Sequence, residues 1–318
     1  NVAAVPIKKA AKAGAQIIVI DSRETELTRY ASLWLRPRPG SEGTLVGGML
    51  RVIVDEALDD HEFVGERVAD SEAFKHSLWD LDLLRVEALT GLPKEQVQEA
   101  ARAFATTNPA AILYGLQTMP RQVREQCVVG LVNLSLVTGN IGKPSAGLYP
   151  LYTGANAQGA RDMGCVPDLL PGHVPVGVAA ASRIEQSWEV DLPRAPGEGV
   201  RELSEAIRSG RVSALVLMGN SPEFTNGELG DFVGAAKRLD LLVVLDSLPS
   251  ELTEIADVLL PSTTFAEVDG TYTNMERRVQ VLRPVLKTRG TEQPDWRTLC
   301  ALARRLGATG FEFESASA

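Results

Sequence analysis

The residues best suited to bind a ligand lie in a stretch that the chain contains twice. Residues 18–35 read IVIDSRETELTRYASLWL, and residues 243–260 read VVLDSLPSELTEIADVLL. In each copy an Asp-Ser pair, Asp21-Ser22 or Asp246-Ser247, directly follows a short apolar run. A carboxylate at the end of a strand can accept hydrogen bonds from ribose hydroxyls or from the N–H edge of guanine. The repeat therefore predicts two similar half-domains, each with a ligand site.

The elements expected around these pairs are those of an α/β fold. Leading into the second copy, the pattern predicts a helix over 200–209, a strand over 212–218, a Gly219-Asn220 turn, a helix over 229–239 and a strand over 241–245. This order is typical of dinucleotide-binding domains, because the glycine lets the backbone approach a phosphate and the acid that follows accepts from the nucleoside.

Before and within the first copy we expect a helix over 6–13 and strands over 17–20 and 33–35. For this copy taken alone, a cap of the following helix, 24–31, explains Asp21 or Ser22 better than a ligand does. The loop after it contains Arg36 and Arg38, which could hold a pyrophosphate or belong to an ordinary basic loop.

Between and after the copies the pattern predicts helices over 44–58, 90–104, 122–137 and 299–306, helical structure within 59–88, and strands over 110–114 and 257–261. Residues 267–274 are expected to form a polar turn that faces a ligand. Arg277 and Arg278 after it could bind phosphate or pair with acids.

Periodicity disappears over residues 139–172, which are rich in Gly, Asn, Gln, Tyr and Arg. A loop of this length inside a compact domain is usually functional. Its Leu, Tyr and Met residues are too apolar for a solvated linker, so we interpret it as an ordered active-site or cofactor loop. The predicted domains are a first α/β half over 1–173 that includes this loop, a boundary over 174–199 and a second half over 200–318.

Composition narrows the class of protein further. The chain has 318 residues and a formal net charge of -9, which argues against a nucleic-acid-binding protein. It has no apolar run long enough to cross a bilayer and no signal peptide. Its three cysteines are scattered and expected to be reduced, buried thiols, and its three histidines lack metal-ligand spacing. These features predict a cytoplasmic protein, alone or at the cytoplasmic face of a membrane complex, with no metal ligand in this chain.

Four motifs resemble those of molybdopterin oxidoreductases, especially formate dehydrogenase catalytic subunits and the large subunit of NADH-quinone oxidoreductase. They read LVTGNIGKPSAG at 136–147, GANAQGARDMGCVPDLLPG at 154–172, MGN at 218–220 and ADVLLPSTTFAEVDGTYTNMERRVQ at 256–280. The resemblance covers nearly the whole chain. It implies two Rossmann-like half-domains related by a pseudo-twofold axis, with molybdenum or tungsten held between two molybdopterin guanine dinucleotides.

The resemblance also implies which residues contact the cofactor. Those expected at one guanosine are Asp21, Ser22, Arg23, Gly40 and Glu42. Those expected at the other are Gly219, Asn220, Asp246, Thr253 and Asp257. Those expected along the pterin are Gly154, Asn156, Gln158 and Gly159.

The chain also departs from the family pattern. It lacks the Cys-rich segment for a [4Fe-4S] cluster, the Cys or selenocysteine that ligates the metal and the C-terminal barrel-like domain. Val129 stands where formate dehydrogenases have a catalytic arginine, so no catalytic residue is assigned. We therefore expect a central fragment, inactive alone, whose partners are the N- and C-terminal domains of its own subunit and iron-sulfur or flavin subunits.

Two alternatives to a formate-dehydrogenase-like oxidoreductase remain at this point. One is a non-catalytic scaffold homologue, such as the large subunit of NADH-quinone oxidoreductase, which Val129 favours. The other is a generic pair of nucleotide-binding α/β domains, which does not explain the polar sequence of the 154–172 loop.

Overall fold

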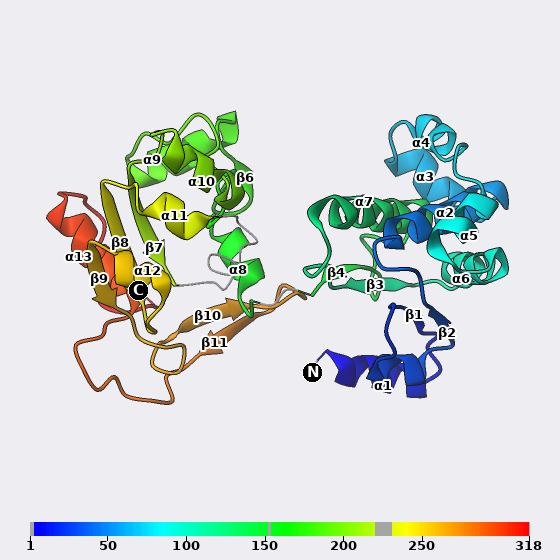
Figure 1. Ribbon diagram of the computed structural model, residues 1–318, viewed down its shortest axis with the longest axis horizontal. Helices are drawn as coiled ribbons and strands as arrows, with labels where there is room; N and C mark the ends of the chain where they lie inside the picture. The colour runs from blue at the N-terminus through cyan, green and yellow to red at the C-terminus, as the bar shows by residue number, and fades with distance from the viewer. Residues whose placement is uncertain (1–2, 152–153, 220–230, 318) are drawn as a thin grey trace. The chain divides into compact units, whose positions relative to one another are not determined.

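The computed structural model describes residues 3–151, 154–219 and 231–317, which pack into two compact units, 1–152 and 153–318 (Figure 1). Both units mix helices with small, mainly parallel sheets, which confirms the predicted α/β class. The division falls inside the glycine-rich segment 139–172, whereas the sequence placed the boundary at 174–199. The Rossmann-like half-domains and their boundary remain predictions, and each unit is described by itself.

The first unit is mostly helical. Its elements are α1 (Ala4–Lys12), β1 (Ile18–Ile20), the 3₁₀ helix η1 (Glu26–Tyr30), β2 (Leu33–Leu35), α2 (Glu42–Asp55), α3 (His61–Arg67), α4 (Ser71–Ser77), α5 (Leu83–Thr90), α6 (Lys94–Thr106), β3 (Ala111–Tyr114), α7 (Arg121–Val137) and β4 (Gly147–Pro150). Strand β1 pairs with β2, and β3 with β4, both in parallel.

Helix α2 is the centre of the first core. Leu45, Met49 and Ile53 form one buried face, as their spacing predicted, and α2 packs against α5, α6 and α7. The helices approach closely because α2 contains glycines at its contacts. A Cβ added at Gly48 would lie 2.8 Å from Val86 Cγ1, inside the packed core.

We therefore expect Gly48→Ala to lower the midpoint of thermal unfolding. Overpacking a filled core costs about 1–3 kcal/mol, which exceeds the roughly 1 kcal/mol that alanine contributes to helix propensity. Gly65→Ala in α3 is the matched control, since no atom lies within 4 Å of the added Cβ. It should raise the midpoint, and a higher midpoint for Gly48→Ala would contradict the close packing.

The second unit contains a larger sheet. Its elements are α8 (Ala157–Asp162), β5 (Leu169–Leu170), β6 (Val174–Pro175), the 3₁₀ helix η2 (Ala179–Ala181), α9 (Ser182–Trp188), α10 (Val200–Arg208), β7 (Ala214–Met218), α11 (Phe232–Ala236), β8 (Leu241–Asp246), α12 (Glu251–Ile255), β9 (Val258–Pro261), β10 (Gly270–Thr273), β11 (Val279–Leu282) and α13 (Asp295–Arg305). Strands β7, β8 and β9 run parallel in that order, so β9, the strand predicted over 257–261, lies at an edge of the sheet formed by the described residues.

One face of this sheet carries the second core. Leu217, Leu242 and Val244 are buried there with residues of α10, α11 and α12. Val216 and Met218 alternate with the buried residues of β7 and are 46% and 44% exposed. On β7, the face towards the helices is therefore buried and the other face is more open.

The sequence repeat is also a structural repeat. Ile18 pairs with Leu33 in β1–β2, and Val243 pairs with Val258 in β8–β9, at matching positions of the two copies. Just before the second strand of each pair, a side chain accepts a hydrogen bond from an equivalent amide. Ser32 Oγ accepts from the N–H of Ile17 at 3.1 Å, and Asp257 Oδ2 accepts from the N–H of Leu242 at 2.7 Å. Each copy is thus a strand, a short helix and a parallel strand.

Several predicted boundaries were wrong. The helix expected over 90–104 is α6 and begins four residues later, at Lys94, because Gly91 ends α5 in the left-handed region at φ 75° and Pro93 caps α6. The aperiodic segment 139–172 contains β4, α8 and β5. The polar turn expected over 267–274 includes strand β10. These elements are short, so periodicity gives little signal for them.

Two of the three cysteines are core residues, as expected, but Cys165 is exposed. No described helix is long and apolar enough to cross a membrane. No group of three or more His, Cys, Asp or Glu side chains in the described ranges could hold a metal ion.

Burial raises the pKa of the Cys127 thiol to about 11, with a smaller contribution from the charge of Glu42. We expect iodoacetamide at pH 8 to label Cys165 and to leave Cys127 unlabelled, because the thiolate is the nucleophile. Peptide mass spectrometry would measure this, and denatured protein, in which both react, is the control. Since the unfolded thiol ionises first, the contribution of Cys127 to stability should fall as the pH rises from 9.0 towards about 11.

Candidate functional site

The carboxyl ends of β7 and β8 bring two predicted site residues together. Gly219 follows β7 with φ 70°, and its N–H donates to the carbonyl of Leu245 at 2.8 Å. Asp246 is the next residue of β8. Its Oδ1 accepts from the N–H groups of Ser247 at 2.7 Å and Leu248 at 3.2 Å. Asn220, predicted for the same site, lies outside the described residues.

The second carboxylate oxygen of Asp246 is unusual. Oδ2 is buried from solvent and has no hydrogen-bond partner among the described residues. An unpaired buried polar atom is costly, and most such atoms in folded proteins have partners. Because Oδ1 is held by two main-chain N–H groups, the carboxylate has a fixed orientation, and Oδ2 can accept from a ligand donor.

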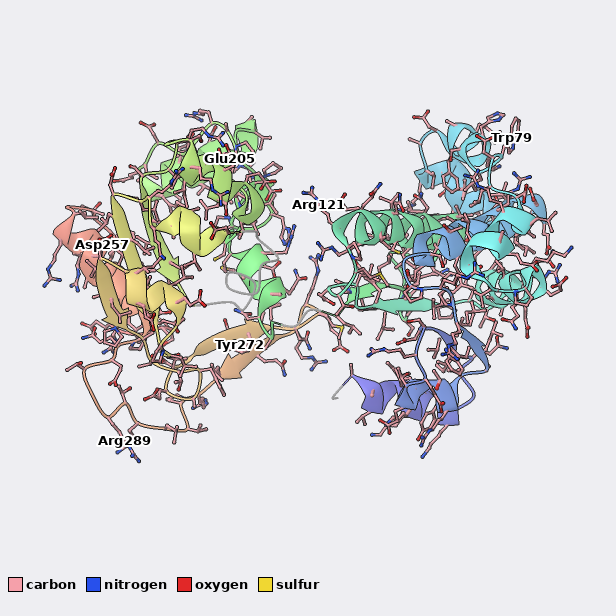
Figure 2. All side chains as sticks on the ribbon, viewed as in Figure 1. Trp79, Arg121, Glu205, Asp257, Tyr272 and Arg289 are labelled. Atoms are coloured by element: carbon pink, nitrogen blue, oxygen red, sulfur yellow. The ribbon has the colours of Figure 1, made fainter. Side chains whose placement is uncertain are left out.

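The other two residues predicted for this site have structural roles. The Thr253 hydroxyl accepts from the N–H of Ser250 at 2.8 Å, and Ser250 Oγ accepts from the N–H of Thr253 at 3.3 Å, which together form the capping box of α12. Asp257, labelled in Figure 2, precedes β9 and binds the N–H of Leu242. It therefore lies at the amino end of the strands, the opposite end from Asp246.

In the first copy the contacts form two groups. Asp21 Oδ1 accepts from the N–H of Arg23 at 2.9 Å, and the Ser22 carbonyl accepts from Nε of Arg36 at 2.9 Å. Neither Asp21 nor Ser22 caps the next helix, because the N-cap of η1 is Thr25. The expected helix cap is therefore absent, and Asp21 orders the corner after β1 as Asp246 does after β8.

The second group is the turn before α2. The Gly40 N–H donates to Glu42 Oε2 at 2.8 Å, and the Ser41 hydroxyl donates to the Arg38 carbonyl at 2.7 Å. Arg38 also donates through Nη1 to the Ala88 carbonyl at 2.6 Å, near the end of α5. Glu42 and Arg38 therefore stabilise local structure, while Arg36 keeps guanidinium donors beyond its bond to Ser22.

The residues predicted along the pterin lie on and before α8, beside β10 (Figure 1). Asn156 Oδ1 accepts from the N–H of Thr273 in β10 at 2.9 Å. A Cβ added at Gly159 would lie 2.2 Å from that oxygen, so only glycine leaves room for the contact. Gln158 Nε2 donates to Asp162 Oδ1 at 2.8 Å, and Gly154 is exposed before the helix.

Sequence reasoning missed Asp162 and His173. His173 Nε2 lies 2.6 Å from Asp162 Oδ1, and both side chains are partly buried. The hydrogen bonds from His173 and Gln158 hold the pKa of the Asp162 carboxyl below its usual value. The spacing of Gln158 and Asp162, four residues apart on a helix, was the available signal. His173 gave none, because its partner lies in another element.

Comparison with known proteins decides the family. The model of the molybdopterin oxidoreductase family matches residues 1–305. The chain belongs to the molybdopterin oxidoreductase family.

Relatives of this molybdopterin oxidoreductase chain agree with the match. It is 36% identical over 313 residues to the F420-dependent formate dehydrogenase 2 subunit alpha of Methanococcus maripaludis, covering 98% of this chain and 46% of that protein. It is 31% identical to the NADPH-Fe(3+) oxidoreductase subunit alpha of Geobacter sulfurreducens, covering 94% of this chain and 35% of that one. The chain thus spans less than half of these relatives.

A solved structure shares the fold of this molybdopterin oxidoreductase chain. Acetylene hydratase from Pelobacter acetylenicus superimposes with a TM-score of 0.73 at 21% identity, over 98% of this chain and 46% of that one. Family membership implies a molybdopterin cofactor. The unpaired Oδ2 of Asp246 fits such a group, since pterins and purines offer N–H donors.

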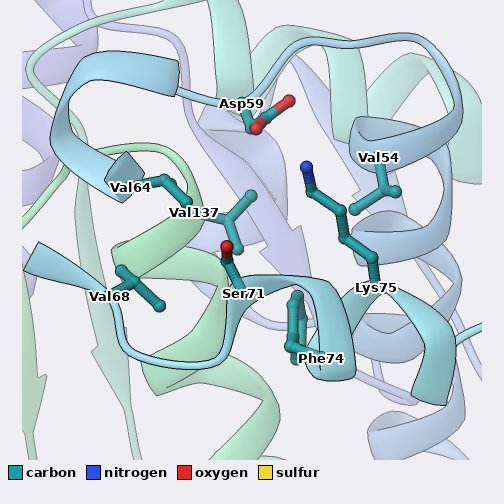
Figure 3. A pocket seen from close by; sticks show the side chains of 8 residues that line it. All are labelled: Val54, Asp59, Val64, Val68, Ser71, Phe74, Lys75 and Val137. Carbon is teal, nitrogen blue, oxygen red and sulfur yellow. The ribbon is translucent and has the colours of Figure 1, made fainter. Parts of the chain in front are cut away.

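Two cavities formed by described residues lie away from this site. The apolar cavity between α3, α4 and α7, lined by Val64, Phe74 and Val137 among others, measures about 10 Å³ (Figure 3). That volume is about the minimum for one water molecule, so no cofactor fits. An open hollow lined by Asp60, Arg67 and Lys143 among others contains none of the predicted site residues.

Gly159→Ala should break the contact between Asn156 and β10. We expect faster amide hydrogen exchange at Thr273, because its N–H loses its acceptor, and a loss of stability of about 1–3 kcal/mol. Gly154→Ala is the control, as the nearest atom to its added Cβ is 3.9 Å away. Unchanged exchange at Thr273 in Gly159→Ala would contradict the contact.

Proposed function

We propose that the chain is the central cofactor-binding part of a molybdenum or tungsten oxidoreductase of the formate dehydrogenase type. It would bind two molybdopterin guanine dinucleotides, one against each copy of the repeat. The observation that carries this proposal is the buried, unpaired Oδ2 of Asp246 at the carboxyl end of a parallel strand. Open α/β sheets bind their ligands at these strand ends.

The chemistry of Asp246 suits guanine. Guanine offers a ring N–H and an exocyclic amino group on one edge, and a carboxylate accepts from such donors strongly. No atom of the described residues lies within 4 Å of a Cβ placed on the neighbouring Gly219, which leaves room for a ligand to approach the backbone. In the first copy, Asp21 would bind the other guanine, with Ser22, Arg23, Gly40 and Glu42 around it.

Residues of the glycine-rich segment 139–172 would hold the pterin part of the cofactor. Gly154, Asn156, Gln158 and Gly159 are the candidates, and Asn156 and Gly159 also fix α8 against β10. When bound, the cofactor supplies the two-electron redox chemistry. The chain itself supplies acceptors and a rigid frame.

The rest of the reaction system is proposed from the relatives. Those named above are alpha subunits, so we propose further subunits that carry iron-sulfur or flavin centres. A [4Fe-4S] cluster and the metal ligand would come from segments outside this sequence, and the complex would act in the cytoplasm.

One observation favours a scaffold homologue instead. Val129, at the position of the catalytic arginine, is 60% exposed on α7 and has no group that can bind a carboxylate such as formate. A non-catalytic subunit with an empty pterin site, like the large subunit of NADH-quinone oxidoreductase, would tolerate this residue. Elemental analysis of the full-length protein from a cofactor-competent host separates the two, since a scaffold would contain neither molybdenum nor tungsten.

Asp246→Ala tests the guanine contact in the full-length protein. Removing a hydrogen bond to a charged group costs about 1.5–3 kcal/mol, so we expect about tenfold or greater loss of guanine dinucleotide, measured as guanosine monophosphate released on hydrolysis. Asp240→Ala is the control, because Asp240 is exposed at the opposite end of β8. Equal dinucleotide content in Asp246→Ala and wild type would overturn the assignment.

A further inference from the structure

Asp162 joins helix α8 to the turn between β5 and β6. It ends α8, where its Oδ1 lies 2.8 Å from Gln158 Nε2 and 2.6 Å from His173 Nε2. Its main-chain oxygen accepts from the N–H of Gly172 at 2.8 Å. The positive charge of Arg277, which follows β10, also lowers the pKa of Asp162. One residue thus holds the helix to the turn between β5 and β6.

The turn adopts an unfavourable backbone conformation to make this contact. His173 has φ 61°, in the left-handed region that side chains with a Cβ rarely occupy. Strain of this kind persists only where surrounding contacts hold it, and it is concentrated at functional sites. Here the Asp162 side chain and main chain supply those contacts.

The ionised carboxylate determines how its two partners are oriented. A carboxylate only accepts hydrogen bonds, so Gln158 must direct its amino group towards Asp162, and His173 must carry a proton on Nε2. The Oε1 oxygen of Gln158 is then left to accept from another group. If the amide were reversed, its oxygen would face a negative charge and its donors would face the ligand.

The far end of α8 is fixed as well. Asn156, at the N-cap, accepts from Thr273 in β10. Gln158 therefore sits in a short helix that is held at one end by the hairpin and at the other by His173, so its side chain has a defined position.

We propose that Asp162 and His173 are positioning residues that hold the Gln158 amide with its Oε1 oxygen available to accept a hydrogen bond from an N–H group of the pterin. This inference rests on the proposed function, because the pterin is the ligand that Gln158 would contact. It assigns roles to two residues that make no contact with the pterin themselves. It also explains why a histidine occupies a backbone conformation that favours glycine.

A matched set of variants tests the proposal in the full-length protein from a cofactor-competent host. His173→Gln keeps an N–H donor for Asp162, whereas His173→Leu has a similar volume and no donor. Asp162→Asn keeps the shape and removes the charge. Pterin retained after gel filtration is measured by fluorescence of the oxidised form, and amide exchange over 157–175 is followed by mass spectrometry in cofactor-free protein.

We expect His173→Leu and Asp162→Asn to lose pterin about tenfold, the lower end of the 10–100-fold range found when residues that orient metal ligands are changed. Both should exchange faster over 157–175, because the contact between α8 and the turn is lost. His173→Gln should match the wild type in both measurements. Wild-type retention in His173→Leu, or equal loss in His173→Leu and His173→Gln, would overturn the positioning role.

A different result would contradict the proposed function itself. In that case the wild-type protein would contain no pterin, and Gln158 would have no pterin to contact. If His173→Leu exchanges faster but still retains pterin, the contact stabilises the loop only, and the acceptor role of Gln158 is overturned.

Discussion

Parallel strand pairing in a fixed register is the constraint on which both candidate guanosine sites depend. Parallel strands end on the same edge of a sheet, so whatever follows β7 lies beside whatever follows β8. This places Gly219 next to Asp246. The first copy obeys the same constraint, because β1 and β2 pair in the matching register and the corner after β1 carries Asp21.

The polar side chains of the repeat divide into two groups because of this geometry. Most of them complete the hydrogen bonding of the backbone: Thr28 and Thr253 donate to the carbonyls of Thr25 and Ser250, and Asp257 accepts from a strand amide. Oδ2 of Asp246 has no partner in the part of the chain that the structure describes. Asp246 is therefore the candidate ligand residue, because its Oδ2 is not used to satisfy the backbone.

Prediction from the sequence was accurate where the apolar pattern was clear. The long helix expected over 122–137 is α7 (Arg121–Val137), and the apolar strand expected over 110–114 is β3 (Ala111–Tyr114). It was wrong in 139–172, where the short elements β5 and α8 lie in a polar, glycine-rich sequence without such a pattern. Such elements are held by contacts such as that between Asp162 and His173, which have no local period.

The sequence alone determined the α/β class, the repeat and the resemblance to molybdopterin oxidoreductases, since apolar periodicity and fixed motifs are local properties of a chain. The tertiary structure decided which candidate residues remain available. It showed Thr253 and Asp257 engaged by the backbone, and it brought Asn156 to Thr273 and Asp162 to His173. Hydrogen-bond partners far apart in the chain are chosen by packing, and packing exists only in the folded molecule.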